Sequence, residues 1–149
     1  MDPGDIVDDF ELPDETGTPR KLSDLLADGP VVLFFYPAAM TGGCTKESCH
    51  FRDLGAEFAA LHAQRVGISR DSVEKQHEFS EKHTFDYPLL SDSDTAVATM
   101  MGVARKHGPP KRVTFVIDQN RKVVEVVKSE IRMDVHADRA LDALRKIQA

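Results

Sequence analysis

The segment from Val31 to Cys49 constrains this chain more than any other. It reads Val-Val-Leu-Phe-Phe-Tyr-Pro-Ala-Ala-Met-Thr-Gly-Gly-Cys-Thr-Lys-Glu-Ser-Cys. Residues 31–36 are an unbroken run of β-favouring apolar side chains, which is typical of a strand covered on both faces. Pro37 stops that strand, and a loop of small residues leads to Cys44, where a helical pattern begins. The sequence therefore predicts a strand–loop–helix unit that places a cysteine at the N-terminus of a helix.

This position makes a thiol reactive. A helix N-terminus presents N–H groups without intrahelical acceptors and a partial positive charge. Both favour the thiolate over the thiol, and the thiolate is the nucleophilic form. Cys44 and Cys49 are the only cysteines in the chain. We therefore interpret Cys44 as a nucleophile directed at an oxidant and Cys49 as the thiol that captures the product.

The spacing of the two cysteines limits what they can do in an intact helix. Residues five apart on a regular helix have Cα atoms on the order of 8–9 Å apart, whereas a disulfide needs roughly 4.4–6.8 Å. Disulfide formation would therefore require the first helical turns to unwind. Four intervening residues also differ from the Cys-x-x-Cys pattern of general disulfide exchangers, which we do not expect this chain to be.

The rest of the chain alternates between strand and helix patterns. Residues 10–12 and 20–22 flank a turn-rich stretch at 14–17, which indicates an N-terminal hairpin. Phe51, Leu54, Phe58 and Leu61 form the apolar stripe of a helix that follows Cys44. Further strands are expected at 65–69, 87–90, 113–117 and 123–127, and the last two form a hairpin around the turn Asp118–Asn120. Asp-Ser-Val-Glu at 71–74 is a helix-start signature with an acidic residue three positions beyond the cap, for a helix from 73 to about 82. Further helices are expected at 95–101 and through Ala137, Ala140, Leu141, Leu144 and Ile147. This order predicts an α/β fold with a mixed sheet between helices.

Bulk properties favour one soluble domain. The chain has 149 residues, 41% hydrophobic and 30% charged, with a net charge of −6. We expect a single domain over residues 1–149 and no nucleic-acid partner, because little here could neutralise phosphates. The acidic start is unlike a secretory signal, and the longest apolar run is far below the ~20 residues of a membrane span. We expect a cytoplasmic protein, with monomer as the default, whose two cysteines act in redox or metal chemistry.

Less specific interpretations compete with the redox one. Both cysteines could be small buried hydrophobic side chains. Cys44, Cys49 and His50 could bind a metal, although their spacing fits no usual structural zinc pattern. The remaining histidines show no ligand spacing, so we expect them to be at the surface or partly buried; these are His62, His77, His83, His107 and His136. We expect no cofactor and no metal.

A family resemblance adds to this interpretation. Pro37, Thr41 and Cys44 form the pattern Pro-x-x-x-Thr-x-x-Cys, which resembles the active-site signature of the peroxiredoxins. The run Cys-Thr-Lys-Glu-Ser-Cys-His-Phe-Arg-Asp at 44–53 is similar to the bacterioferritin-comigratory, or PrxQ, branch, whose second cysteine also follows the first by five residues. Similarity extends to Asp-Phe-Glu-Leu-Pro-Asp at 9–14, Tyr-Pro-Leu-Leu-Ser-Asp at 87–92 and Thr-Phe-Val-Ile-Asp at 114–118. The resemblance implies a thioredoxin-like fold, a mixed central β-sheet flanked by helices with an N-terminal β-hairpin extension.

The resemblance also implies roles for single residues. Cys44 would be the peroxidatic thiolate and Cys49 the resolving thiol, while Thr41 and Arg112 would bind the thiolate and the peroxide. Pro37 and Gly43 would line the substrate site, with Pro37 shielding it from water. Glu47 lies one turn after Cys44, where its charge opposes the thiolate unless it is paired. The resemblance implies that it joins a hydrogen-bond network with Thr41 and Arg112.

The implied activity is a thiol-dependent peroxidase that acts in antioxidant defence. It would reduce hydrogen peroxide and organic hydroperoxides through a sulfenic acid and an intrachain disulfide, and thioredoxin or a similar dithiol protein would recycle it. Two other functions stay open. The same oxidation could make the chain a redox sensor that signals by local helix unwinding, or the fold could be an interaction module with an inert cysteine pair.

Overall fold

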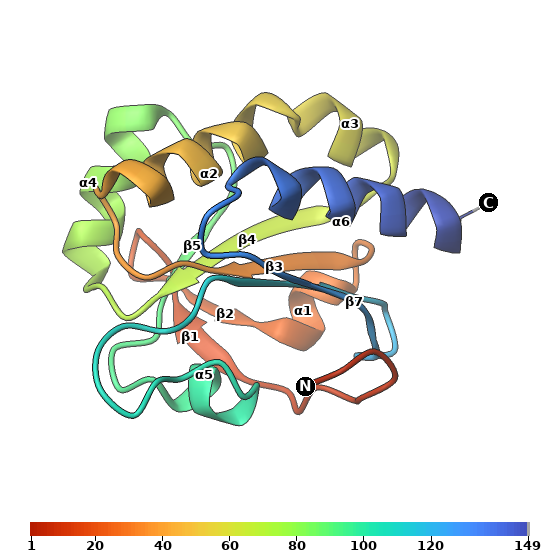
Figure 1. The fold of residues 1–149 in the computed structure, drawn as a ribbon, viewed down its shortest axis with the longest axis horizontal. Coiled ribbons are helices and arrows are strands. Elements are labelled where there is room, and N and C mark those ends of the chain that lie inside the picture. The colour runs from red at the N-terminus through yellow and green to blue at the C-terminus, as the bar shows by residue number, and fades with distance from the viewer. Residues whose placement is uncertain (149) are drawn as a thin grey trace.

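A computed structural model describes residues 1–148. Its centre is a five-stranded mixed sheet in the order β5-β4-β3-β6-β7 (Figure 1). The strands are β3 (Val31–Phe35), β4 (Gln64–Ser69), β5 (Leu89–Ser91), β6 (Val113–Ile117) and β7 (Val123–Lys128). β3 pairs in parallel with β4 and antiparallel with β6, and β6 and β7 form the predicted hairpin. The predicted α/β architecture is confirmed.

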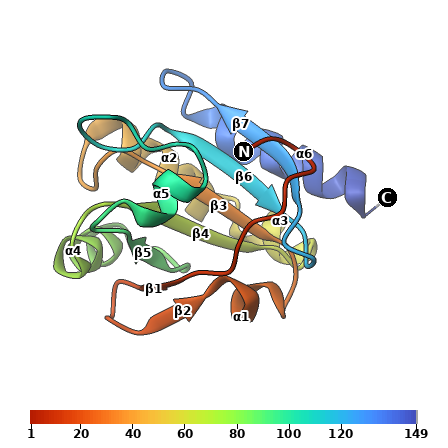
Figure 2. The same ribbon diagram turned by 90° about the horizontal axis from the view of Figure 1, so that it is seen from below.

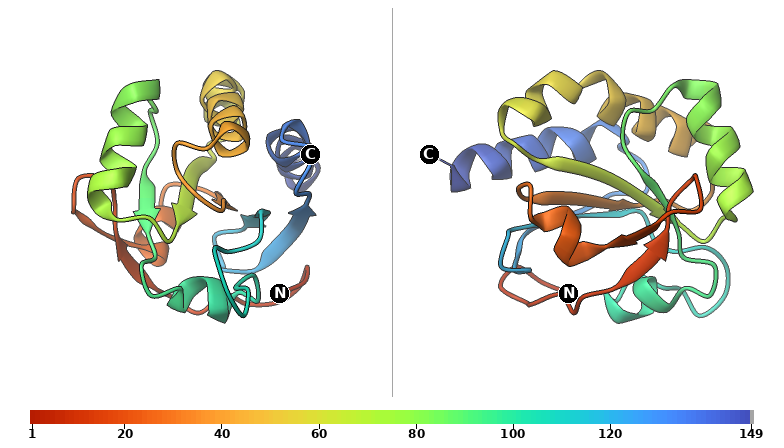
Figure 3. Two further views of the ribbon diagram at one scale, coloured as in Figure 1. Left: turned by 60° about the vertical axis from the view of Figure 1, so that its left-hand side comes forward. Right: turned by 180° about the vertical axis from the view of Figure 1, so that it is seen from behind.

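Helices cover one face of this sheet, and smaller elements cover the other. The first face carries α2 (Gly42–Asp53), α3 (Gly55–Ala60), α4 (Val73–His83) and α6 (Asp134–Ile147). Figure 3 shows α4, α2 and α6 in its left view as neighbouring helices above the sheet. The opposite face carries α5 (Ala96–Met100), α1 (Leu22–Leu26) and a separate antiparallel hairpin of β1 (Glu11–Pro13) and β2 (Pro19–Lys21), seen from below in Figure 2. The predicted N-terminal hairpin is therefore confirmed.

β3 is the central strand because its side chains supply both cores. All five of its residues are buried. Val32 and Phe34 point into the core under the helices, where Phe34 stacks on Phe51 of α2 with ring centroids 4.2 Å apart. Leu33 and Phe35 point into the core under the hairpin. Because successive strand residues face opposite sides, an unbroken apolar run is what a strand covered on both faces requires.

Local signals also set the ends of the helices. Ser72 begins α4, and its side chain accepts a hydrogen bond from the Lys75 N–H at 3.2 Å, as expected for an N-cap. The Asp92 carboxylate, four residues before the start of α5, accepts hydrogen bonds from the N–H groups of Val97 and Ala98 in its first turn. Gly102 follows α5 with φ +75°, a conformation that glycine adopts without strain.

Three features differ from the expectation. The apolar stripe after Cys44 predicted one helix, but Leu54 adopts φ −94° and ψ 18°, which separates α2 from α3. The apolar pattern places Ile147 on the buried stripe of the last helix. Its side chain is instead 45% exposed, because it lies in the last turn of α6. α1 had no predicted counterpart, since five residues are too few for periodicity to be visible. Over residues 1–148, no helix is long and apolar enough to cross a membrane.

Candidate active site

The loop between β3 and α2 is fixed to the next strand. The Ala39 N–H donates to the Asp71 carboxylate at 2.8 Å, and Ser69 at the end of β4 donates to the same carboxylate at 2.6 Å. Met40 then adopts a left-handed conformation with φ 68°. These constraints determine where α2 begins, because they hold the chain immediately before the helix.

Cys44 is the third residue of α2 and its side chain is wholly buried. The first intrahelical bond joins the Thr45 N–H to the Thr41 carbonyl at 2.9 Å. The N–H groups of Gly42, Gly43 and Cys44 therefore have no acceptor within the helix, as at any helix N-terminus. The predicted placement of a cysteine at a helix start is confirmed.

Arg112 connects the cysteine to a buried carboxylate. It precedes β6 and is 6% exposed. Its Nη2 donates to the Cys44 Sγ at 3.3 Å, and its Nη1 donates to the Glu47 Oε1 at 2.6 Å. The Arg112 guanidinium thus holds a positive charge beside the Cys44 sulfur and also pairs with the Glu47 carboxyl group, one turn further along α2.

Glu47 is wholly buried, and this burial decides its ionisation. Burial raises its pKa from the ordinary value of 4.5 to about 8, although the Arg112 guanidinium acts in the opposite direction. Burial itself lowers the Arg112 pKa, but Glu47 and Cys44 outweigh it and raise that pKa overall. The network expected around Glu47 is present, and it contains Arg112 but not Thr41.

His136 is the residue that sequence reasoning missed. The expectation that it lies at the surface or is partly buried is wrong: it is wholly buried in the first turn of α6. Its Nε2 lies 2.8 Å from the Ser129 carbonyl, and its Nδ1 lies 2.7 Å from the Thr114 hydroxyl and 3.5 Å from the Glu47 Oε2. A signal was available, because His136 precedes Ala140 by four residues and so falls on the buried stripe of that helix.

The other predicted site residues lie around this group at different distances from the sulfur. Thr41 is exposed, and its hydroxyl donates to the Ala38 carbonyl at 2.8 Å rather than to Cys44. Pro37 is half-buried in the loop after β3. Gly43 lies against the guanidinium, since a Cβ there would meet the Arg112 Nη2 at 3.2 Å. The glycine thus allows Arg112 to approach the first turn of α2.

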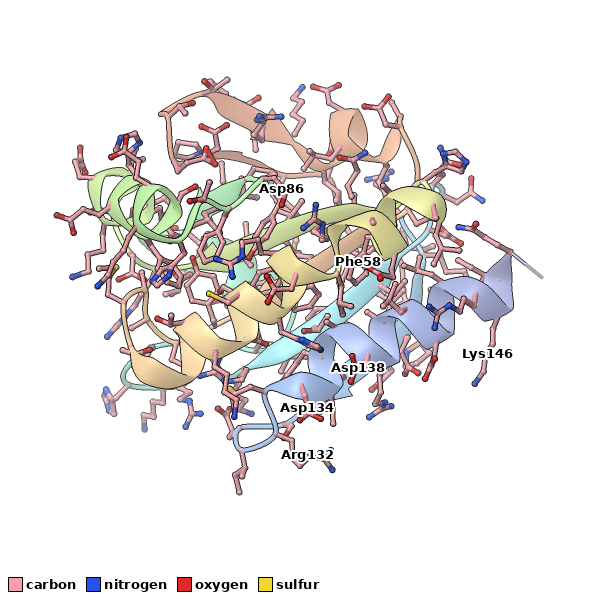
Figure 4. All side chains as sticks on the ribbon, turned by 90° about the horizontal axis from the view of Figure 1, so that it is seen from above. Phe58, Asp86, Arg132, Asp134, Asp138 and Lys146 are labelled. Atoms are coloured by element: carbon pink, nitrogen blue, oxygen red, sulfur yellow. The ribbon has the colours of Figure 1, made fainter. Side chains whose placement is uncertain are left out.

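Cys49 lies one and a half turns further along the same helix, partly exposed. Both cysteines are free, as the intact helix between them requires. Burial raises the Cys49 pKa. The residue lines a surface cavity of about 300 Å³ that Asp134 of α6 also lines. Figure 4 shows Asp134 and Asp138 along α6, and Asp138 lies 2.8 Å from the His50 Nε2 of α2.

The structure of residues 1–148 does not support the metal site considered for Cys44, Cys49 and His50. Within residues 1–148, no three His, Cys, Asp or Glu side chains come together as a group that could hold a metal ion. The site instead contains a buried sulfur, a guanidinium and a carboxylate. Of these, the guanidinium can stabilise negative charge that develops on sulfur and on an attacked oxygen.

Comparison with known proteins identifies close relatives. The model of the AhpC/TSA family matches residues 3–126. A peroxiredoxin of Mycobacterium tuberculosis is 63% identical over 153 residues, covering 100% of this chain and 99% of the relative. The crystal structure of the peroxidoxin BcpB of the same organism superposes with a TM-score of 0.98 at 63% identity, covering 100% and 99% of the two chains.

A more distant structure has the same fold. It is the bacterioferritin comigratory protein of Xanthomonas campestris, with a TM-score of 0.87, 31% identity and coverage of 94% of this chain and 92% of that chain. Its published description concerns alkyl peroxide reduction activity and a trapped intermediate. The thioredoxin-like fold implied by the sequence resemblance is therefore confirmed.

Proposed function

This chain belongs to the AhpC/TSA family, in the bacterioferritin-comigratory or PrxQ branch of the peroxiredoxins, which are thiol-dependent peroxidases, and we propose that its peroxidatic residue is Cys44. The observation that supports this most is the contact of Arg112 with the buried Cys44 sulfur at a helix start. Cys49, five residues later in the same helix, is the resolving thiol.

In the first step the Cys44 thiolate attacks one oxygen of a hydroperoxide. An S–O bond forms while the O–O bond breaks, and the leaving hydroxide or alkoxide takes up a proton to become water or an alcohol. Arg112 stabilises the negative charge because its N–H groups are already in place on the sulfur. The Arg112 Nε is buried without an acceptor among the described residues and so is a further unpaired donor in the site.

In the second step the Cys49 thiol attacks the Cys44 sulfenic acid. A disulfide forms and water leaves. Because both residues belong to α2, the helix must open before the sulfurs meet. One structural feature supports opening at the N-terminal end of α2: its first turn contains two glycines, Gly42 and Gly43.

An external dithiol protein of the thioredoxin type then reduces the disulfide, which returns both cysteines to thiols. Cys49 is the sulfur that this reductant would reach, because it is partly exposed while Cys44 is buried. For the substrate we propose hydrogen peroxide and organic hydroperoxides, in keeping with the alkyl peroxide activity described for the Xanthomonas campestris relative.

The remaining site residues act at the entrance. Thr41 is exposed beside the first turn of α2, where its hydroxyl could turn from the Ala38 carbonyl to a bound peroxide. Pro37 and Gly43 line the approach, and Gly43 leaves room for Arg112. We propose that residues 1–149 act as one domain and as a monomer in the cytoplasm, in antioxidant defence, since two free cysteines suit a reducing compartment.

A steady-state assay tests this function. Hydrogen peroxide consumption is followed with thioredoxin, thioredoxin reductase and NADPH, for the wild type, Cys44→Ser and Cys49→Ser. We expect no turnover with Cys44→Ser, and one turnover without recycling with Cys49→Ser. Consumption by Cys44→Ser at the wild-type rate would rule out the mechanism. A wild type that oxidises once and is not recycled by any dithiol would instead favour the redox sensor.

A further inference from the structure

Two buried acceptor atoms face each other behind Arg112. The Nε2 of His136 must carry a hydrogen, because its partner at 2.8 Å is the Ser129 carbonyl, which can only accept. In the neutral ring Nδ1 is then an acceptor, and the Thr114 hydroxyl donates a hydrogen bond to it at 2.7 Å. The Glu47 Oε2, at 3.5 Å from the same Nδ1, is left as a buried oxygen with no hydrogen-bond partner among the described residues.

A proton resolves this arrangement. Two facing acceptors repel each other, and an unpaired buried carboxylate oxygen is costly. One hydrogen on Nδ1, or one on Oε2 with the Thr114 hydroxyl turned away from the single lone pair of Nδ1, converts the repulsion into attraction. We propose that Glu47 and His136 hold one exchangeable proton between Oε2 and Nδ1, and that His136 thereby acts as a positioning residue that tunes the pH at which Cys44 reacts with peroxide.

The charges of the site explain why this proton matters. With the proton present, Glu47 and His136 together are neutral, so the Arg112 charge is left to the Cys44 thiolate. Without this proton, the Glu47 carboxylate competes with the sulfur for the same guanidinium. The Glu47 Oε1 already lies 2.6 Å from the Arg112 Nη1. A buried cluster of one cation and two anions is less stable than a neutral one.

The surrounding groups allow such a proton near neutral pH. Burial raises the pKa of Glu47 to about 8 and lowers that of His136 below its ordinary value of 6.5, so near neutral pH the carboxyl group keeps its proton and the imidazole is neutral. α2 and α6, which carry these residues, lie side by side on the same face of the sheet (Figure 1). The charged and titratable groups that face the pair are Cys44 from α2, Arg112 from the segment before β6, Glu130 from the segment before α6 and Arg139 from α6.

Two variants of His136 separate proton sharing from simple packing. Asn can bond to Thr114 or Glu47 but cannot take up a proton, and Leu fills the space without any polar atom. The measured quantity is the rate constant for Cys44 oxidation by hydrogen peroxide from about pH 5 to pH 9, in a Cys49→Ser background so that the sulfenic acid persists. His77→Asn is the matched control, because His77 also faces a glutamate, at 3.3 Å, but on the surface of α4.

We expect His136→Asn to need a higher pH for the same rate, because its side-chain N–H can donate to the Glu47 Oε2 and so favours the competing carboxylate. His136→Leu should need no higher pH, because it leaves Glu47 more desolvated and protonated. A displacement of about one pH unit corresponds to a rate about tenfold lower on the rising part of the profile. His77→Asn should give the wild-type profile. An unchanged profile in His136→Asn would overturn the proposal, and so would an equal loss at every pH, which is what a purely structural role produces.

A second measurement is independent of peroxide chemistry. In reduced protein labelled with ¹⁵N-histidine, the His136 Nδ1 resonance should titrate with pH, and Glu47→Gln should alter that titration. An Nδ1 that stays unprotonated and unaffected by Glu47→Gln would also overturn the proposal. The inference rests on the proposed peroxidase for its kinetic part only. If wild-type Cys44 did not react with peroxide, the proposed function would fail, while the resonance would still report on the proton.

Discussion

At the scale of single residues, Arg112 is the connection on which the site depends. It is the group that contacts both the Cys44 sulfur and the Glu47 carboxylate. A planar guanidinium with several donors in fixed directions can bridge two anions, whereas an ammonium acts as a point charge. The charge and the geometry of Arg112 therefore contribute separately to the rate of Cys44 oxidation.

Arg112→Lys tests the geometric contribution. The variant keeps a positive charge near Glu47 and loses the fixed donor on the sulfur, so the rate constant for Cys44 oxidation should fall about 100-fold, as when one preorganised donor is removed. The measurement is rapid mixing with hydrogen peroxide followed by thiol alkylation. Arg105→Lys is the control, because Arg105 forms an exposed pair with Glu130 at 2.9 Å. An Arg112→Lys rate constant equal to that of the wild type would show that the fixed Arg112 donor does not speed Cys44 oxidation.

Glu47 makes a prediction about stability and pH. Its pKa rises from 4.5 to about 8 on folding, so between these values the folded state keeps a proton that the unfolded state has released. Wild-type stability should therefore fall as pH rises through this window, by up to ~1.4 kcal/mol per pH unit. Glu47→Gln cannot titrate and should lack this slope.

Chemical denaturation at several pH values provides the measurement. His136 contributes in the opposite sense, because its pKa is lowered and its stabilisation is lost as pH falls below its ordinary value of 6.5. Comparing wild type with Glu47→Gln isolates the carboxyl group. Parallel stability curves for the two proteins over this window would contradict the raised pKa of Glu47.

At the scale of elements, α2 contains both cysteines, and its first two residues, Gly42 and Gly43, are exposed. Its first turn contains two glycines, and the preceding loop depends on the Ala39–Asp71 hydrogen bond. Its C-terminal part is held more firmly, since Phe51 is buried and stacks on Phe34 of β3. This distribution favours opening from the N-terminal end.

Amide hydrogen exchange tests that opening. In the disulfide form, amides of residues 44–52 should exchange faster than in the reduced form, because the helical hydrogen bonds between the cysteines are lost. α4 is the internal control, and its amides should be unchanged. Equal protection of residues 44–52 in the two forms would show that the disulfide forms without unwinding.

The strands and most helices could be predicted because their signals are local. The run of residues 31–36, the turn at Asp118–Asn120 and the Ser72 cap each act within a few neighbours. The break at Leu54 could not be predicted, since the stripe through Phe51 and Phe58 continues across it and the periodicity contains no sign of it. α1 is too short to show periodicity at all.

At the scale of the whole molecule, the site joins segments that are far apart in sequence. Arg112 and Glu47 are separated by 65 residues, and Thr114 and His136 by 22. Arg112 could be named through the family resemblance, and Glu47 through its place one turn after Cys44. The contacts of His136 depend on how α6 packs beside α2 over β6, which no local pattern specifies.

The proposed monomer makes a prediction about the molecule in solution. The large apolar side chains that are exposed among the described residues are Ile6, Ile131 and Ile147, in three separate segments. Stable dimers generally bury a contiguous apolar patch. Sedimentation velocity should therefore give one species of 16.5 kDa whose mass does not rise with concentration. A larger species that grows with concentration would contradict this.

Cys49 is proposed to react with the sulfenic acid of Cys44 and form a disulfide. Intact mass spectrometry after one equivalent of hydrogen peroxide measures this product. The wild type should lose about 2 Da, the two hydrogens of a disulfide, while Cys49→Ser should gain about 16 Da, the oxygen of a sulfenic acid. Cys44→Ser should keep its mass. A wild type that gains oxygen without forming the disulfide, or a Cys44→Ser protein oxidised as readily as the wild type, would contradict the account.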